Sequence, residues 1–235
     1  MAAASLREER LELADARRRW GENADPAAVI RWFATNAEVE YMAGCYGAAL
    51  KDAGYARRLA TDPATVARAL RVIGCVQLER GDSDAAIASL RASGEVGAAD
   101  LAFALAEAGR FEEAVGVCVG APTDWARGRL VRARLRAGVT DSSAPIGEGK
   151  ESFGWIQLRL AEAELLLASG DSTAAVEAAA ALIDEMRNAG VRSQLGDALL
   201  VRARALEGPD RIAAEKEVRE LALSLGSGRL LALLA

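Results

Sequence analysis

Apolar residues recur along most of the chain at the three- and four-residue intervals of amphipathic helices, and no clear alternating pattern of a strand appears. Glycines interrupt these stretches, and five of them begin nearly the same phrase, in which an alanine stands five residues after the glycine. A repeated unit of helix, glycine turn and helix predicts a stacked array of helical hairpins. The predicted turn glycines are Gly44, Gly81, Gly109, Gly138, Gly170 and Gly208.

The pattern divides the chain into three parts. Residues 1–22 hold an N-terminal capping helix over 5–20, in which charged residues surround a narrow apolar face. Residues 23–225 form the array, and residues 226–235 form a C-terminal apolar tail. The tail has three interpretations: a last helix of the core, a surface for self-association in a homodimer, or the continuation into a longer protein.

The helix starts and stops suggest about six units. Asp25-Pro26 and Asp62-Pro63 are start signals, because Asp caps a helix and Pro fits its first turn. In the fourth unit, an irregular loop over 138–151, rich in Ser, Gly and Pro, stands where a second helix is expected. Such a loop is either functional or poorly ordered. The expected units run over about 26–60, 63–93, 96–120, 123–138, 152–189 and 191–225.

Composition supports helices and argues against several partners. Hydrophobic residues make up 51% of the chain and aromatic residues only 5%, so the apolar content is mostly Ala and Leu, which favour helices. The net charge of −5 argues against general nucleic-acid binding, which usually needs a basic surface. The N-terminus lacks the apolar core of a signal peptide, and no apolar run approaches the roughly 18 residues of a membrane span. We therefore expect a cytoplasmic protein without membrane association.

The chain lacks the residues that most enzymes and metal sites use. It contains no histidine, the commonest general acid or base and the commonest metal ligand. Cys45, Cys75 and Cys118 stand alone, which is typical of buried free thiols rather than of a zinc site or a disulfide framework. A segment that ends in Lys150 fails as a phosphate-binding loop, because Glu151 stands where a hydroxyl is needed. We expect no catalytic residues, no bound metal and no cofactor.

The units resemble tetratricopeptide repeats, whose period is about 34 residues. In the second unit, the large and small residues of the family's pattern match Leu70, Ile73, Gly74, Gly81, Ala86, Leu90 and Ser93. The sequence is similar to the divergent arrays of this type in bacterial regulators and signalling proteins. The resemblance implies a right-handed α-solenoid of about six helix-turn-helix repeats.

In arrays of this kind, the first helix of each unit lines a concave groove. The most conspicuous polar feature is a run of arginines in the fourth unit, of which Arg132 and Arg136 share one helical face. Two interpretations stay open: a groove that clamps an acidic or C-terminal carboxylate group, or a solvated helix face paired with acidic neighbours. By the resemblance, the groove candidates are Arg68, Arg71, Phe103, Trp125, Arg132, Arg136, Gln157 and Glu164.

The expected function is therefore binding rather than catalysis. The leading hypothesis is a non-catalytic protein-interaction scaffold that holds a peptide or protein segment, acidic in character, in its concave groove. The alternative is a sensor domain of a bacterial transcriptional or signalling regulator, in which a small ligand or peptide changes the curvature of the array.

Overall fold

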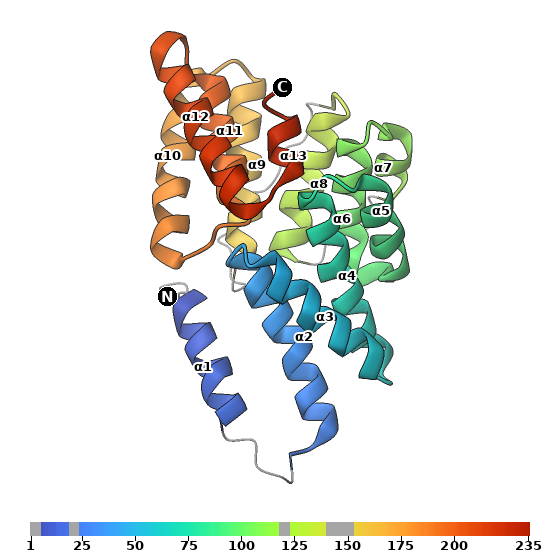
Figure 1. The fold of residues 1–235 in the computed structure, drawn as a ribbon. Coiled ribbons are helices and arrows are strands. Elements are labelled where there is room, and N and C mark those ends of the chain that lie inside the picture. Colours follow the sequence, from blue (N-terminus) through green and yellow to red (C-terminus); the bar gives the residue numbers. More distant parts are fainter. Residues whose placement is uncertain (1–5, 19–23, 118–122, 140–152) are drawn as a thin grey trace.

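The structure is a computed structural model that describes residues 6–18, 24–117, 123–139 and 153–235. These residues form an all-helical fold without strands (Figure 1). None of the described helices combines the length and the apolar character needed to cross a lipid bilayer. The helices are α1 (Leu6–Arg18), α2 (Pro26–Met42), α3 (Tyr46–Leu59), α4 (Pro63–Glu79), α5 (Ser83–Ala92), η1 (Gly94–Gly97), α6 (Ala98–Glu107), α7 (Phe111–Val117), α8 (Asp124–Arg136), α9 (Gly154–Ala168), α10 (Ser172–Ala189), α11 (Leu195–Ala205), α12 (Gly208–Leu225) and α13 (Gly228–Ala232).

The helices pack in two layers. Each helix contacts the next one along the chain, and the first helices of successive hairpins also contact one another. We call α2, α4, α6, α8, α9 and α11 the inner layer, because these helices touch in that order. The second helices, such as α3, α5 and α10, pack mainly against their neighbours in the chain. The capping helix α1 packs on α2, where the indole of Trp32 donates to the Leu13 carbonyl at 2.9 Å.

The six predicted turn glycines all have left-handed backbone, with φ between 56° and 87°. Five of them close the preceding helix with the same pair of hydrogen bonds, as at Gly81, whose N–H donates to Leu78 while Asp82 donates to Gln77. This is the Schellman arrangement, which favours glycine because the backbone there is left-handed. Gly208 differs: it begins α12, and no such bond pair involves it.

The alanines that follow these glycines explain the repeated phrase. Ala49, Ala86 and Ala175 are fully buried, and Ala114 is 1% exposed, so a small side chain lets the two helices of each hairpin approach closely. The fifth phrase is the exception, because Ala213 is exposed and its neighbour Ala214 is buried instead. The phrase at Gly208 is therefore not equivalent to the other four.

The fourth unit brings two inner helices into direct contact. Helix α8 packs against α9, and a Cβ atom added to Gly128 would lie 2.2 Å from the Gln157 carbonyl carbon. Only glycine permits so close an approach of the two backbones at this point. From residue 140 on, the loop predicted over 138–151 lies outside the described residues.

The last helices return to the first ones. After α10, the backbone N–H groups of Arg192 and Ser193 donate to the Met42 carbonyl at 2.9 and 3.2 Å. The tail forms α13, which lies among the inner helices and contacts α4 (Figure 1). Leu230 is fully buried there, so the tail is a last helix of the core in this structure. Among the described residues, the return of α13 to α4 interrupts any groove that would run along the whole inner layer.

Candidate binding site beside a charged core

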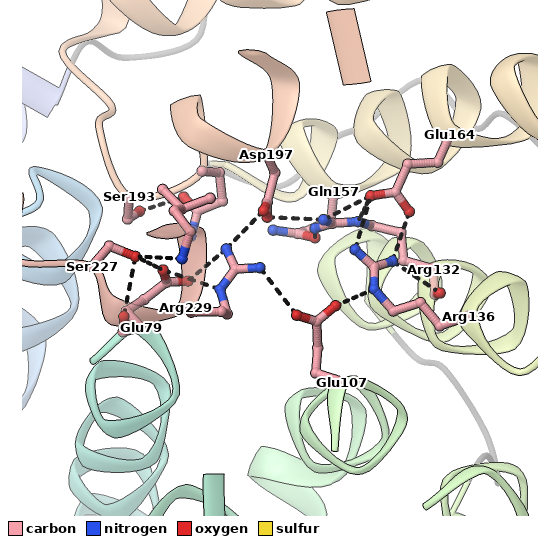
Figure 2. A network of polar contacts seen from close by, with 12 residues as sticks. Glu79, Glu107, Arg132, Arg136, Gln157, Glu164, Ser193, Asp197, Ser227 and Arg229 are labelled. Carbon is pink, nitrogen blue, oxygen red and sulfur yellow. Dashed lines mark hydrogen bonds and ion pairs between the residues drawn. The ribbon is translucent and has the colours of Figure 1, made fainter. Parts of the chain in front are cut away.

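Six charged side chains from five helices form a closed ring of ion pairs among the inner helices (Figure 2). Three are arginines and three are carboxylates, so the ring is neutral. We call this group the charged ring; it consists of Glu107 on α6, Arg132 and Arg136 on α8, Glu164 on α9, Asp197 on α11 and Arg229 on α13.

Asp197 is the best-paired carboxylate of the charged ring. Its two oxygens accept from Arg132 Nη2 at 2.8 Å and from Arg229 Nη2 at 2.7 Å. Burial alone favours the protonated acid, but the charges of Arg229 and Arg132 more than offset this and hold the pKa of Asp197 far below its ordinary value. The carboxylate therefore stays ionised although its side chain is only 3% exposed.

The other side of the ring runs through Glu164 and Glu107. Glu164 accepts from Arg132 Nε and from Arg136 Nη1, each at 2.9 Å. Glu107 accepts from Arg136 and, at 3.4 Å, from Arg229 Nη1, which closes the ring. Burial opposes ionisation of both acids, yet the arginine charges lower the pKa of each of them below its ordinary value.

The aromatic ring of Phe103 lies within reach of all the arginines of the charged ring and of Arg129. The guanidinium carbons of Arg129, Arg136 and Arg132 lie 4.3, 4.5 and 4.7 Å from its centroid, and that of Arg229 lies at 6.0 Å. Phe103 is fully buried, so its aromatic side chain replaces water as the neighbour of these cations. Arg129 also pairs with a carboxylate, because its Nε atom lies 3.1 Å from Asp100 Oδ1, so this buried cation has both an aromatic and an anionic neighbour.

Glu79 joins the charged ring from α4 and behaves differently from the other acids. It accepts from Arg229 Nε and from the Ser227 hydroxyl, both at 3.2 Å (Figure 2). Burial raises the pKa of Glu79 above its ordinary value; Arg229 partly lowers it again, and the nearby charge of Asp197 adds to the increase. Glu79 is thus the most weakly stabilised anion of the group.

A second polar cluster lies beside this core. Asp100 accepts from Arg71 Nε at 2.7 Å and from the Trp125 indole at 3.1 Å. Arg68 donates through two nitrogens to Glu38, at 2.5 and 3.3 Å. The Arg68 side chain is 39% exposed and that of Arg71 is 20% exposed, whereas Arg132 is fully buried.

Two adjoining cavities open at this second cluster, and Glu38, Arg71 and Trp125 line both. One measures about 300 Å³, and its further lining is mainly apolar: Tyr41, Met42, Val72, Cys75 and Phe153. The other measures about 470 Å³ and adds Arg68, Glu95, Val96, Ala99 and Thr123. We call these the apolar cavity and the polar cavity. Together they offer an apolar recess next to exposed charges, the usual composition of a binding site.

The structure separates the eight groove candidates into two sets. Arg68, Arg71 and Trp125 line the two cavities, while the other five belong to the core around the charged ring: Phe103, Arg132, Arg136, Gln157 and Glu164. Of these five, Arg136 and Glu164 also line a further cavity of about 200 Å³, and the Arg136 side chain is 21% exposed. The arginines of α8 thus fit neither interpretation fully. They do pair with acidic neighbours, but Arg129 and Arg132 lie in the interior rather than on a solvated face.

The acidic half of the core was not predicted, namely Glu79, Asp100, Glu107 and Asp197, and neither was Arg229. A usable signal was present. Asp197 and Arg229 each stand as a charge within a strongly apolar stretch, and a charge in such surroundings is buried only when it is paired.

No protein-family model matches the chain, and comparisons with curated proteins and with solved structures likewise give no match. The tetratricopeptide resemblance therefore stays a prediction, and a function for this chain has to be inferred from the site itself.

Proposed function

We propose that this protein is a non-catalytic interaction module, built as a divergent tetratricopeptide-like array, that binds a segment of a protein partner in the apolar and polar cavities. The observation that carries the proposal is the pair of adjoining cavities, which share Arg71 and Trp125. A peptide side chain that enters the apolar cavity would contact Tyr41, Met42 and Val72 and remove apolar surface from water.

The charges at the cavities favour an acidic group on the partner next to this apolar side chain. Arg68 is the most exposed arginine of the site, and its guanidinium already makes a two-pronged contact with a carboxylate, that of Glu38. A partner carboxylate can take the same geometry by exchange with Glu38.

The titratable groups of the site support binding rather than catalysis. Burial raises the pKa of the Cys75 thiol far above its ordinary value, so the thiolate that a nucleophile needs is absent at neutral pH. Asp100 is buried, but the charges of Arg71 and Arg129 hold its pKa below the ordinary value. It is an ionised partner for arginine and not a proton donor.

The size of the apolar cavity favours a second candidate function, that of a sensor domain. About 300 Å³ is at the lower end of the range for small-molecule sites. A ligand that bound there would raise the melting temperature with its concentration. A thermal-shift screen of metabolites separates this function from peptide binding.

The test of the leading proposal is to fill the polar cavity. Ala99 lines it and is partly exposed, so Ala99→Trp places a large side chain where the partner segment would lie. Ala92→Trp is the control, because Ala92 is exposed at the end of α5 and lines neither cavity. Partners captured by the wild-type chain are identified, and their affinity is measured with purified components.

We expect Ala99→Trp to lower the affinity for the partner by at least about tenfold, the size of effect seen when a central contact of an interface is lost. Ala92→Trp should leave the affinity unchanged. Equal affinity for both variants, with intact melting curves, would place the partner elsewhere and refute the assignment of the cavities.

A further inference from the structure

The place that α13 occupies has the features of a recognition site for a short arginine-bearing segment. The guanidinium of Arg229 meets three carboxylates on three different helices: Nε donates to Glu79, Nη1 to Glu107 and Nη2 to Asp197, and Nη2 also lies 3.2 Å from Glu79. A lysine ammonium is a single point charge and cannot meet three acceptors arranged around a planar fork. The site is therefore matched to arginine.

Charge makes a cation obligatory at this place. The charged ring is neutral only because Arg229 contributes one of its three arginines, and Glu79 adds a further carboxylate beside it. An empty site would leave Glu79, Glu107 and Asp197 buried with too few cations, which is strongly unfavourable. Whatever occupies the site must bring a positive charge.

The residues on either side of Arg229 in the sequence also fit the site, through a hydrogen bond and through close packing. The Ser227 hydroxyl donates to the Glu79 carbonyl oxygen at 3.1 Å. A Cβ atom at position 228 would lie 2.4 Å from the Arg80 carbonyl oxygen, so only glycine fits there. Leu230 is fully buried against Gly196. A Cβ atom added to Gly196 would lie 2.2 Å from the Cδ1 atom of Leu230. The site thus selects the order Ser, Gly, Arg, Leu.

The occupant itself is a short helix at the surface of the protein. Helix α13 has only five residues, and it follows Gly226, whose left-handed backbone (φ 66°) ends α12. Ala232 and Ala235 are exposed and Leu231, Leu233 and Leu234 are half-buried, so the segment lies at the surface with one side inward. A second segment can reach the same place from solvent once α13 moves out.

We propose that the α13 site, formed by Glu79, Glu107, Gly196 and Asp197, binds a partner segment of the type Ser-Gly-Arg-Leu, and that residues 226–231 occupy it in cis as a competitor. The partner is thus a protein with an exposed, arginine-bearing turn followed by leucine. This goes beyond the proposed function and uses none of its cavity residues, so either can fail without the other.

The experiment uses a fluorescent peptide with the sequence of residues 226–235 and the full chain. Gly228→Val prevents α13 from docking through the contact with Arg80 but leaves the acidic residues of the site in place. Gly54→Val is the control, because a side chain at Gly54 on α3 meets open space. Fluorescence anisotropy measures the affinity, and circular dichroism with thermal melting reports folding.

We expect the peptide to bind Gly228→Val at least about tenfold more tightly than the wild type and Gly54→Val, because a tethered competitor acts at an effective concentration in the millimolar range. Replacing the peptide's arginine by alanine or lysine should remove most of this binding. Equal binding of the arginine and alanine peptides, or no binding to a folded Gly228→Val chain, would overturn the proposal.

A measurement on the wild-type chain covers the case in which Gly228→Val does not fold. Amide hydrogen exchange should be faster at residues 229–235 than in α4 and α11, and a millimolar excess of the arginine peptide should accelerate it further. Exchange of these amides only through global unfolding, unaffected by the peptide, would contradict displacement of α13.

Discussion

The two ends of the inner layer use the same pair of chemical groups for different purposes. Around α8, α9, α11 and α13, arginines and carboxylates pair with one another in the charged ring, where Arg132 is fully buried and Asp197 is 3% exposed, and where Arg136, at 21% exposed, borders a small cavity of about 200 Å³. Around α2 and α4, the pair of Arg68 and Glu38 is 39% and 27% exposed and borders a cavity. Burial, not residue type, separates a structural ion pair from one that is available to a partner.

The difference arises from where the chain returns on itself. Helix α13 and the segment after α10 cover the later inner helices and dock against the ends of α2 and α4. The apolar and polar cavities are lined mainly by residues of α2, α4, α6 and α8, whereas a smaller cavity of about 200 Å³ borders the charged ring at Arg136, Glu164 and Asp197. We call the region of the charged ring the closed half, because most of its charges are buried, and the region of the two larger cavities the open half.

The sharpest test of this comparison removes one carboxylate from each half. Asp197→Ala leaves Arg132 and Arg229 buried with incomplete partners, and we expect it to reduce the free energy of unfolding by about 3–5 kcal/mol. Glu38→Ala removes a partly exposed pair and should cost less than about 1 kcal/mol. Urea unfolding of both variants measures the difference. Similar losses would show that the closed half is not distinct.

The second-largest effect should be a loss of stability in acid, caused by the carboxylates of the closed half. The pKa values of Glu107, Glu164 and Asp197 are lowered in the folded protein, because nearby arginine charges outweigh the effect of burial. Such groups stabilise the fold above their ordinary pKa values, 4.5 for Glu and 3.8 for Asp. This stability is lost as the pH falls through the folded values. The free energy of unfolding in urea should therefore decrease steadily as the pH is lowered below about 4.5.

Glu79 supplies the matched control for this pH dependence. Its pKa is raised, so the folded state binds the proton more tightly than the unfolded state, and this group alone adds stability as the pH falls through its folded value. In Glu79→Gln this contribution is absent, so the gain in stability that Glu79 provides as the pH falls toward 4.5 should be missing, while the loss below 4.5 should match that of the wild type. The same gain above pH 4.5 in both proteins would contradict the assigned direction for Glu79.

The local features of the fold could be read from the sequence, and their physical basis is short-range. The helix starts at Asp25-Pro26 and Asp62-Pro63 depend on a cap within three residues, and the Asp25 and Asp62 side chains do accept from the backbone of the first turn. The phrase that identified turns failed at Gly208, and it overlooked Gly190 and Gly226. Both of these close their helices with Schellman bonds but lack the matching alanine.

The site was only partly predictable, because its contacts are long-range. Helical periodicity placed Arg132 and Arg136 on one face of α8. It cannot show that Asp197, 65 positions away, accepts from Arg132, or that Arg229 reaches back to Glu79 across 150 positions. Those pairs exist only because α11 and α13 pack beside helices that precede them by many residues, and the sequence of a single helix does not determine such packing.

The smallest effect on stability should accompany a clear effect on binding. Arg68→Gln shortens the side chain and removes a charge that is exposed by more than a third, so the free energy of unfolding should change by less than about 0.5 kcal/mol. Arg57→Gln on the exposed face of α3 is the matched control. A partner with an acidic group should lose affinity for Arg68→Gln alone, and the loss should shrink at high salt. If both variants bind the partner equally, the open half does not use Arg68, and its exposure would reflect only the absence of a covering helix.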